Sequence, residues 1–449
     1  MISRFFKKYN TGRTQKANLN TILSLLFKCG SILLSFILVP LTINYIKPDI
    51  YGVWLTLSSL VGWIAMLDIG IANGLKNKLS ESLAANNYAQ GKIYVSTTYV
   101  IIGLIAIGLV CIYLLFYQFV NWQSVFNSPF IPENKLRDTV SIVTILFLLK
   151  FVADIINVIA AAFQMVAVSS CLLFLSNLGV TLSVWILTKT TLANMVLLAI
   201  CLSLIPLLIS VIASLILFNT SFKSIKPSLE KVNFSSSKGI LSLGWQFFII
   251  QIVVIVIFQT DNIIISHFFE PKEVTNFNVA YKYYSILAII FSIILTPYWT
   301  AYNEAYFKKD ILWIKSSIQK LVKIFLISLL VSLFMIFVSS SFFRMWVGDE
   351  IKISISLSVW LCLYIAIMNW SSIFSNFLNG VGKIRLQMTF APLVAVINIS
   401  LSIFFIKVLH LDIVAIPLAN ALSLSLGAFL GFIQYKKIIN NTAVGIWNK

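Results

Sequence analysis

Long apolar runs, which follow one another along nearly the whole chain, are the feature that most restricts its fold. The run LNTILSLLFKCGSILLSFILVPLTINYI, residues 19–46, exceeds the roughly 20 residues that a helix needs to cross a bilayer. Such runs are also too long and unbroken for the alternating strands of a membrane β-barrel. With 59% hydrophobic and 11% charged residues among 449, the sequence excludes an ordinary water-soluble globule. It predicts an all-α polytopic membrane protein.

Length and hydropathy together predict about twelve membrane-spanning helices. The first 18 residues carry five basic residues and no small-residue cleavage site follows them, so we expect an uncleaved first helix rather than a signal peptide. The expected spans lie near residues 19–46, 51–73, 93–119, 139–166, 170–188, 192–218, 240–267, 275–301, 319–343, 354–379, 387–408 and 413–435.

Basic residues are distributed unevenly between the two sides of the membrane that these spans create. With the N-terminus inside, 22 Lys and Arg residues fall on the inner side and eight on the outer side. This asymmetry predicts that both termini are cytoplasmic, because basic loops remain on that side during insertion. It also explains most of the formal charge of +18. A basic face toward anionic lipid is therefore a simpler interpretation than a nucleic-acid partner.

A polar interruption near the middle of the chain predicts two lobes. The segment SFKSIKPSLEKVNFSSSKG, residues 221–239, contains a proline, several serines and four lysines. We therefore expect an N-terminal six-helix lobe at 1–219, a cytoplasmic linker at 220–238 and a C-terminal six-helix lobe at 239–449. Because six is even, both lobes would enter the membrane the same way round, as in repeats related by an axis along the membrane normal.

Similar polar features follow equivalent spans in the two halves. Asp68 ends the second span and Glu304 ends the eighth, and a basic segment follows each. After Asp68, Leu75, Leu79 and Leu83 recur every fourth residue, as along one side of a short amphipathic helix. We expect this helix to lie on the inner membrane surface.

Several classes of function lack their sequence signatures. The five cysteines lie in apolar runs, and His267 and His410 are far apart, so we expect no disulfide framework, metal site or cofactor. No GxxxxGK[ST] phosphate loop is present. No segment between spans is much longer than about 20 residues, which argues against a membrane glycosyltransferase or polymerase with an outer catalytic loop. We expect a transporter and not an enzyme.

Charged residues inside the spans are the candidate binding residues, because each costs about 2.5–3.5 kcal/mol at mid-bilayer. Lys28 lies nine residues into the first span, or roughly 13 Å along a helix. It either reaches back to the inner headgroups or faces a cavity. Lys150 and Asp154 stand one turn apart in the fourth span. They either neutralise each other inside the bundle or contribute to a substrate site.

The seventh and eighth spans carry further polar candidates. Gln251 and Asp261, with Asn262 beside the latter, give one side of the seventh span a polar character, and such a side should face protein or water. Lys282 lies in VAYKYYS near the outer end of the eighth span. A belt of interfacial tyrosines with a lysine that reaches the headgroups is the alternative to a binding role for Lys282.

Four segments give the chain a resemblance to a known family. They are LDIGIANGLKNKLSESLAAN (67–86), LGWQFFIIQIVVIVIFQTDNIIISHFFEPKEVTNFNVAYKYY (243–284), TPYWTAYNEAYFKKD (296–310) and NFLNGVGKIRLQ (376–387). Together they resemble the Wzx-type polysaccharide flippases, the oligosaccharide branch of the MOP superfamily that also contains the MATE multidrug exporters. The resemblance covers nearly the whole chain.

The resemblance implies a MATE-like fold of twelve helices in two lobes, which open a central cavity alternately inward and outward. The implied substrate is an oligosaccharide repeat unit linked through pyrophosphate to a polyprenyl lipid, which crosses the bacterial inner membrane for O-antigen, lipopolysaccharide or capsule assembly. A polysaccharide polymerase and a chain-length regulator are implied partners. On this view Lys28 or Lys150 would meet the pyrophosphate, while Gln, Asn and Tyr side chains would meet the sugars.

The resemblance also suggests where gating residues lie. Asp68, Gly70 and Gly74 would form a hinge where the second span meets the inner surface, with Glu304 as the equivalent residue in the second half. The alternative for Asp68 is a helix cap, or an ion pair with Lys76 or Lys78.

Three other functions compete with a polysaccharide flippase. A MATE-type exporter of organic cations would share the fold, but it would favour acids rather than lysines in its cavity. A flippase for peptidoglycan precursors is chemically closer, although such relatives often have two further helices. A membrane glycosyltransferase or polymerase belongs to a different class, and the short loops oppose it.

Overall fold

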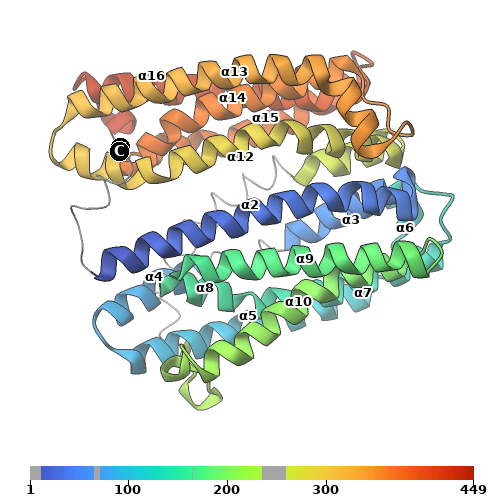
Figure 1. Cartoon of the computed structure of the whole chain (residues 1–449), viewed down its shortest axis with the longest axis horizontal. Helices are drawn as coiled ribbons and strands as arrows, with labels where there is room; N and C mark the ends of the chain where they lie inside the picture. The colour runs from blue at the N-terminus through green and yellow to red at the C-terminus, as the bar shows by residue number, and fades with distance from the viewer. Residues whose placement is uncertain (1–11, 65–70, 164, 235–258, 449) are drawn as a thin grey trace. The chain divides into compact units, whose positions relative to one another are not determined.

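The protein is described here by a computed structural model, which covers residues 12–64, 71–163, 165–234 and 259–448 (Figure 1). Every regular element within these ranges is a helix. The helices of the first half are α2 (Gly12–Ile46), α3 (Pro48–Ile64), α4 (Ile71–Ala84), α5 (Tyr88–Phe116), α6 (Trp122–Phe126), α7 (Glu133–Ala153), α8 (Ile155–Ala162), α9 (Val166–Thr190) and α10 (Met195–Asn219).

The second half is built from five long helices within the described ranges. They are α12 (Pro271–Phe307), α13 (Ile311–Val347), α14 (Ile355–Gly380), α15 (Arg385–Lys407) and α16 (Ala415–Ile439). Short 3₁₀ helices follow α10, namely η2 (Lys223–Ile225) and η3 (Leu229–Lys231), and η5 (Gly445–Asn448) follows α16. The expected all-α architecture is therefore confirmed.

Polar residues between the apolar runs set the starts of several helices. Asn87 accepts a hydrogen bond from the backbone N–H of Gln90 at 3.0 Å, and Asp310 accepts one from Trp313 at 3.0 Å. Such caps satisfy N–H groups that have no partner inside the helix. Lys47, with φ of 71°, ends α2 in the left-handed region, and Pro48 then begins α3.

Ten helices within the described ranges are long and apolar enough to cross a membrane. They match ten of the expected spans. The second span corresponds to α3, of which 17 residues are described, and most of the seventh, near 240–267, lies outside the described residues. The protein is thus a multi-pass membrane protein.

The fourth span is interrupted in the middle. The sequence predicts one span at 139–166, but the chain turns at Asp154, so that α7 ends at Ala153 and α8 begins at Ile155. Within a bilayer such a break is tolerated where protein or water satisfies the freed backbone groups. Ile155 and Ile156, directly after the break, are buried in a cluster with other helices.

The amphipathic helix predicted after the second span is present as α4, but its apolar side does not lie on the membrane surface. Leu75 and Leu79 are fully buried and pack in a cluster with Val95 of α5, Ile155 of α8 and Phe222. The apolar side of α4 thus faces protein, because a leucine every fourth residue fits a protein groove as well as a lipid surface. A position of α4 at the inner membrane surface stays a prediction. On the polar side of α4, the hydrogen bond to Glu81 raises the pKa of the Lys78 ammonium.

The polar segment that follows α10 is folded onto the first half of the chain. Phe222 and Ile225 are buried in the same cluster as Leu75 of α4 and Val95 of α5. The backbone N–H groups of Ser228 and Asn233 each donate a hydrogen bond of 3.0 Å to Ser96 and Thr97 of α5, respectively. As far as residue 234, the expected linker is therefore fixed to α5, and residues 235–238 lie outside the described part.

Backbone contacts divide the described chain into two units. The first contains residues up to Lys47 and from Leu60 to 234, and α2 runs beside α9 within it (Figure 1). The second contains Pro48–Ser59 and the residues from 259 onward. Thr275 of α12 holds α3 in this second unit, because its hydroxyl donates to the Pro48 carbonyl oxygen at 2.7 Å.

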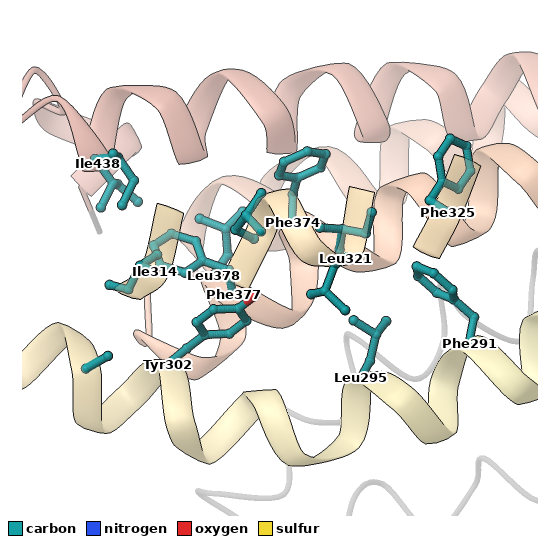
Figure 2. Packing of buried hydrophobic residues seen from close by; sticks show 14 residues of the cluster. Phe291, Leu295, Tyr302, Ile314, Leu321, Phe325, Phe374, Phe377, Leu378 and Ile438 are labelled. Carbon is teal, nitrogen blue, oxygen red and sulfur yellow. The ribbon is translucent and has the colours of Figure 1, made fainter. Parts of the chain in front are cut away.

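Aromatic packing between α12, α13, α14 and α16 forms the core of the second unit. Figure 2 shows Tyr302 of α12 beside Phe377 of α14, and their ring centroids lie 5.4 Å apart in an edge-to-face arrangement. Gly380 permits this close approach, since a Cβ there would lie 2.7 Å from the Trp299 carbonyl oxygen. The core packs these four helices against one another.

Candidate functional site

Lys150 and Asp154 form an ion pair in the first unit, and the predicted pairing is therefore confirmed. Lys150 lies in the last turn of α7, and Asp154 occupies the turn between α7 and α8. The two side chains are 31% and 34% exposed, so the pair is partly buried.

Neighbouring groups hold the carboxylate of Asp154 independently of the lysine. The Ser210 hydroxyl of α10 donates to Asp154 Oδ1 at 2.7 Å, and Asn157 of α8 reaches the same oxygen at 3.5 Å. The Lys150 ammonium also lies at the carboxyl end of α7, where the helix dipole favours a cation. Ser210 and Asn157 thus contact Asp154 in addition to Lys150.

Lys28 lies on an exposed side of α2. Its neighbours face α9: the hydroxyls of Ser24 and Ser170 are 2.7 Å apart, and Asn177 donates to the Ser31 carbonyl oxygen at 3.3 Å. Lys28 itself is exposed and has no ion pair among the residues that the structure describes. Its ammonium is therefore accessible, as both alternatives for its role require.

Asp261 anchors a buried polar chain in the second unit. Asn420 of α16 donates to Asp261 Oδ2 at 2.8 Å. Asn398 of α15 donates in turn to Asn420 at 2.6 Å and to Ser423 at 3.1 Å. All four residues are buried. Asp261 Oδ1 has no hydrogen-bond partner among the described residues, so this carboxylate keeps acceptor capacity for a proton or a donor group.

The neighbouring residue Asn262 connects the seventh span to two other helices. Its amide nitrogen donates to the Ser59 hydroxyl of α3 at 2.8 Å, and its oxygen accepts from Asn278 of α12 at 2.6 Å. Asn262 is 9% exposed and Asp261 is 5% exposed. The prediction that this side of the seventh span faces protein rather than lipid is confirmed for these two residues.

The tyrosines around Lys282 do not form a belt at the membrane surface. Tyr283 and Tyr284 are buried, and Tyr283 stacks on Phe342 of α13 with centroids 4.6 Å apart. Tyr281 stacks on Tyr364 of α14. Lys282 is itself only partly exposed. The alternative of an interfacial tyrosine belt is wrong here, because these rings fill spaces between helices.

Several partners of the predicted residues were not found from the sequence. Ser210 contacts the Lys150–Asp154 pair, and Asn398 and Asn420 belong to the buried polar chain at Asp261. Each of the three is a single uncharged residue within an apolar run. The available signal was weak: Asn398 and Ser402 stand four residues apart, and Asn420 and Ser423 stand three apart, so each pair shares a helix face.

The predicted gating residues are only partly covered by the structure. Gly74 lies in α4, and Glu304 forms an exposed ion pair with Lys308 near the end of α12. Asp68, Gly70 and the predicted binding residue Gln251 lie outside the described residues. Lys78, one of the two alternative ion-pair partners suggested for Asp68, pairs with Glu81 at 2.8 Å. The gating and binding roles of all these residues stay predictions.

The fold and the clusters define an all-α, multi-span membrane protein whose helix bundles hold ionisable and amide side chains, as membrane transporters do. The chain belongs to the family described as polysaccharide biosynthesis protein, which matches residues 19–302. The sequence resemblance described above is thereby confirmed.

Relatives and solved structures agree with this assignment. The chain is 24% identical to a putative O-antigen transporter of Salmonella typhi, over 88% of this chain and 90% of that protein. It is 22% identical to a putative O-antigen export protein of Yersinia pseudotuberculosis, over 83% and 85% of the two chains. An inward-facing multidrug resistance MATE transporter of the MOP superfamily has the same fold, with a TM-score of 0.78, 13% identity and coverage of 94% and 98%.

Proposed function

We propose that this chain is a flippase that moves a polyprenyl-pyrophosphate-linked oligosaccharide from the inner to the outer leaflet by alternating access. The single observation that carries the proposal is the similarity to O-antigen transport and export proteins over more than four-fifths of the chain. The family assignment and the transporter fold support it. The repeat unit would serve O-antigen or capsular polysaccharide assembly.

The accessible cations inside the spans suit an anionic substrate. Lys28 on α2 and Lys150 on α7 would meet the pyrophosphate, because an ammonium at this depth is stabilised by an anionic ligand or by water. Asp154 would balance the charge of Lys150 between transport cycles. Gln251, Asp261 and Lys282 would contribute polar contacts, and Asp68, Gly70, Gly74 and Glu304 would serve the hinge regions.

The basic residues support a location in the bacterial inner membrane with both termini in the cytoplasm. On this orientation the segment 220–238 and α4 lie at the inner side, where anionic headgroups attract their lysines. A polysaccharide polymerase and a chain-length regulator would act on the product at the outer side.

Substitution of Lys28 tests the proposed role in pyrophosphate binding. Lys28→Gln keeps much of the side-chain length and removes the charge, so lipid-linked oligosaccharide should accumulate in the inner leaflet. Lys28→Arg keeps the charge and should retain partial activity, since a guanidinium is broader than an ammonium. The measurement is surface polysaccharide in a flippase-null strain that carries each variant at matched protein levels.

Two controls complete this experiment. Lys189→Gln removes an exposed lysine from the last turn of α9 and should leave surface polysaccharide unchanged. Wild-type polysaccharide from Lys28→Gln would show that Lys28 only reaches the headgroups. Failure of the wild-type chain to restore polysaccharide, together with export of organic cations such as ethidium, would instead support a multidrug exporter.

A further inference from the structure

A small cavity lies between α14, α15 and α16 in the second unit, apart from the Asp261 cluster described above. Its volume is about 160 Å³. Ser371 and Ser375 of α14, Gln387 and Phe390 of α15, and Gly427 and Gln434 of α16 are among its lining residues. Mostly apolar walls with a few convergent polar groups are typical of small-molecule sites.

The lining indicates what kind of group the cavity can hold. None of its described lining residues carries a charge. An ionised ligand would therefore lose its hydration without gaining a counter-ion. Two hydroxyls and two amides offer both donors and acceptors, while Phe390 offers an apolar face. A neutral ligand with several hydroxyl groups and an apolar face fits this combination.

Gln434 lacks a donor for its side-chain oxygen. Its amide nitrogen donates to the Lys383 carbonyl oxygen at 3.1 Å and to the Trp447 carbonyl oxygen at 3.2 Å, which fixes the orientation of the amide. Gln434 is fully buried, and its Oε1 has no partner among the described residues. Because buried polar atoms rarely stay unpaired, this oxygen calls for a donor such as a ligand hydroxyl.

Gly427 leaves the cavity open on the side of α16. A Cβ built on Gly427 meets no atom within 4 Å, whereas one built on Gly431, a turn away, lies 3.6 Å from Phe374. Glycine is among the least favourable residues inside a helix, and nothing among the described contacts of Gly427 requires it. The space beside it is therefore available to a ligand.

We propose that this cavity is a saccharide subsite, in which one sugar ring of the transported lipid-linked oligosaccharide places hydroxyl groups against Gln434, Gln387 and the two serines. The inference rests on the proposed flippase function and adds to it a place for the neutral part of the substrate. Within the second unit, this cavity of α14, α15 and α16 would hold the sugar ring.

The test compares two lipids on the purified full-length protein in lipid nanodiscs. One is the lipid-linked repeat unit extracted from cells in which the flippase gene is deleted, and the other is polyprenyl diphosphate without sugar. The wild-type chain should bind the first at least about tenfold more tightly, as one or two additional hydrogen bonds would give. The difference between the two dissociation constants is the quantity measured.

Two variants and one control locate this difference. Gly427→Leu fills the cavity and should abolish the preference for the sugar-bearing lipid, while the affinity for polyprenyl diphosphate stays unchanged. Gln387→Met keeps the length without the amide and should reduce the preference severalfold. Gly108→Leu, at an exposed position of α5 where an added Cβ also meets nothing within 4 Å, should behave as wild type.

The outcomes separate the subsite from the flippase function. If the wild type binds both lipids equally while it still restores surface polysaccharide in cells, the subsite is disproved and the flippase function stands. If it binds neither lipid, the flippase function fails as well. If Gly427→Leu weakens both lipids alike, the cavity holds the lipid chain and the saccharide assignment is wrong.

Discussion

The ion pair of Lys150 and Asp154 is the residue-scale feature with the clearest energetic consequence. Asp154→Asn leaves a half-buried ammonium without its counter-ion, and the double change with Lys150→Gln removes both charges. Breaking a fully buried pair costs about 3–5 kcal/mol. We expect about 1–2 kcal/mol here, because a half-exposed pair is partly screened. The single variant should therefore have a lower Tm than the double variant.

An exposed ion pair provides the control for that comparison. Arg344 and Asp349 lie 2.8 Å apart, and both side chains are 76% exposed. Asp349→Asn should change the Tm little, since exposed pairs contribute about 0–1 kcal/mol. A double variant at Lys150 and Asp154 that is no more stable than Asp154→Asn would contradict the idea that the two charges neutralise each other.

At this scale the sequence predicts charged residues better than their uncharged partners. Lys150 and Asp154 stand out because charge is rare within apolar runs, and their spacing of four residues places them on one helix face. Ser210 is one of many serines in spans, and its contact with Asp154 crosses 56 residues of sequence. Local patterns carry no information on such contacts, which depend on how the helices pack.

At the scale of elements, hydropathy predicts the spans well and their packing poorly. The leucines of α4 repeat as expected, yet they pack against α5 and α8 rather than on a membrane surface. The turn at Asp154 also has no nearby glycine or proline from which it could be predicted. Both features arise from contacts with other helices, which an amphipathic or apolar pattern alone does not distinguish from contacts with lipid.

Gly52 allows α3 to pack closely against the start of α12. A Cβ on Gly52 of α3 would lie 1.7 Å from the carbonyl oxygen of Pro271, at the start of α12. The neighbour is backbone and cannot rotate away, so α3 or α12 must shift. Gly52→Ala should therefore destabilise the purified protein by about 1–3 kcal/mol, measured as a fall in Tm.

A second glycine separates this steric effect from the general effect of replacing glycine in a helix. Gly103→Ala in α5 adds a Cβ that meets nothing within 4 Å. It should leave the Tm unchanged or raise it, because alanine favours helix by up to about 1 kcal/mol over glycine. Equal Tm values for the two variants would show that α3 and α12 are not held as closely as described.

On the scale of the whole molecule, the polar segment near mid-chain predicts two lobes, but the grouping of the helices also depends on their backbone contacts. Residues 48–59 belong by sequence to the expected first lobe, yet their contacts group them with the second unit. The hydrogen bond from Thr275 to Pro48 joins residues 227 apart in sequence. A helix can thus follow one half of the chain in sequence and pack with the other, which neither length nor hydropathy reveals.

The orientation of the whole chain in the membrane follows from its basic residues and can be tested at two exposed leucines. Leu229 is 83% exposed after α10, and Leu192 is 92% exposed between α9 and α10. We expect Leu229 inside and Leu192 outside, because 22 basic residues against eight oppose the reverse insertion. Each leucine is replaced by cysteine in a chain without the five native cysteines. A membrane-impermeant maleimide should label Leu192→Cys in intact cells and Leu229→Cys only after the cells are opened, whereas the opposite pattern would place both termini outside.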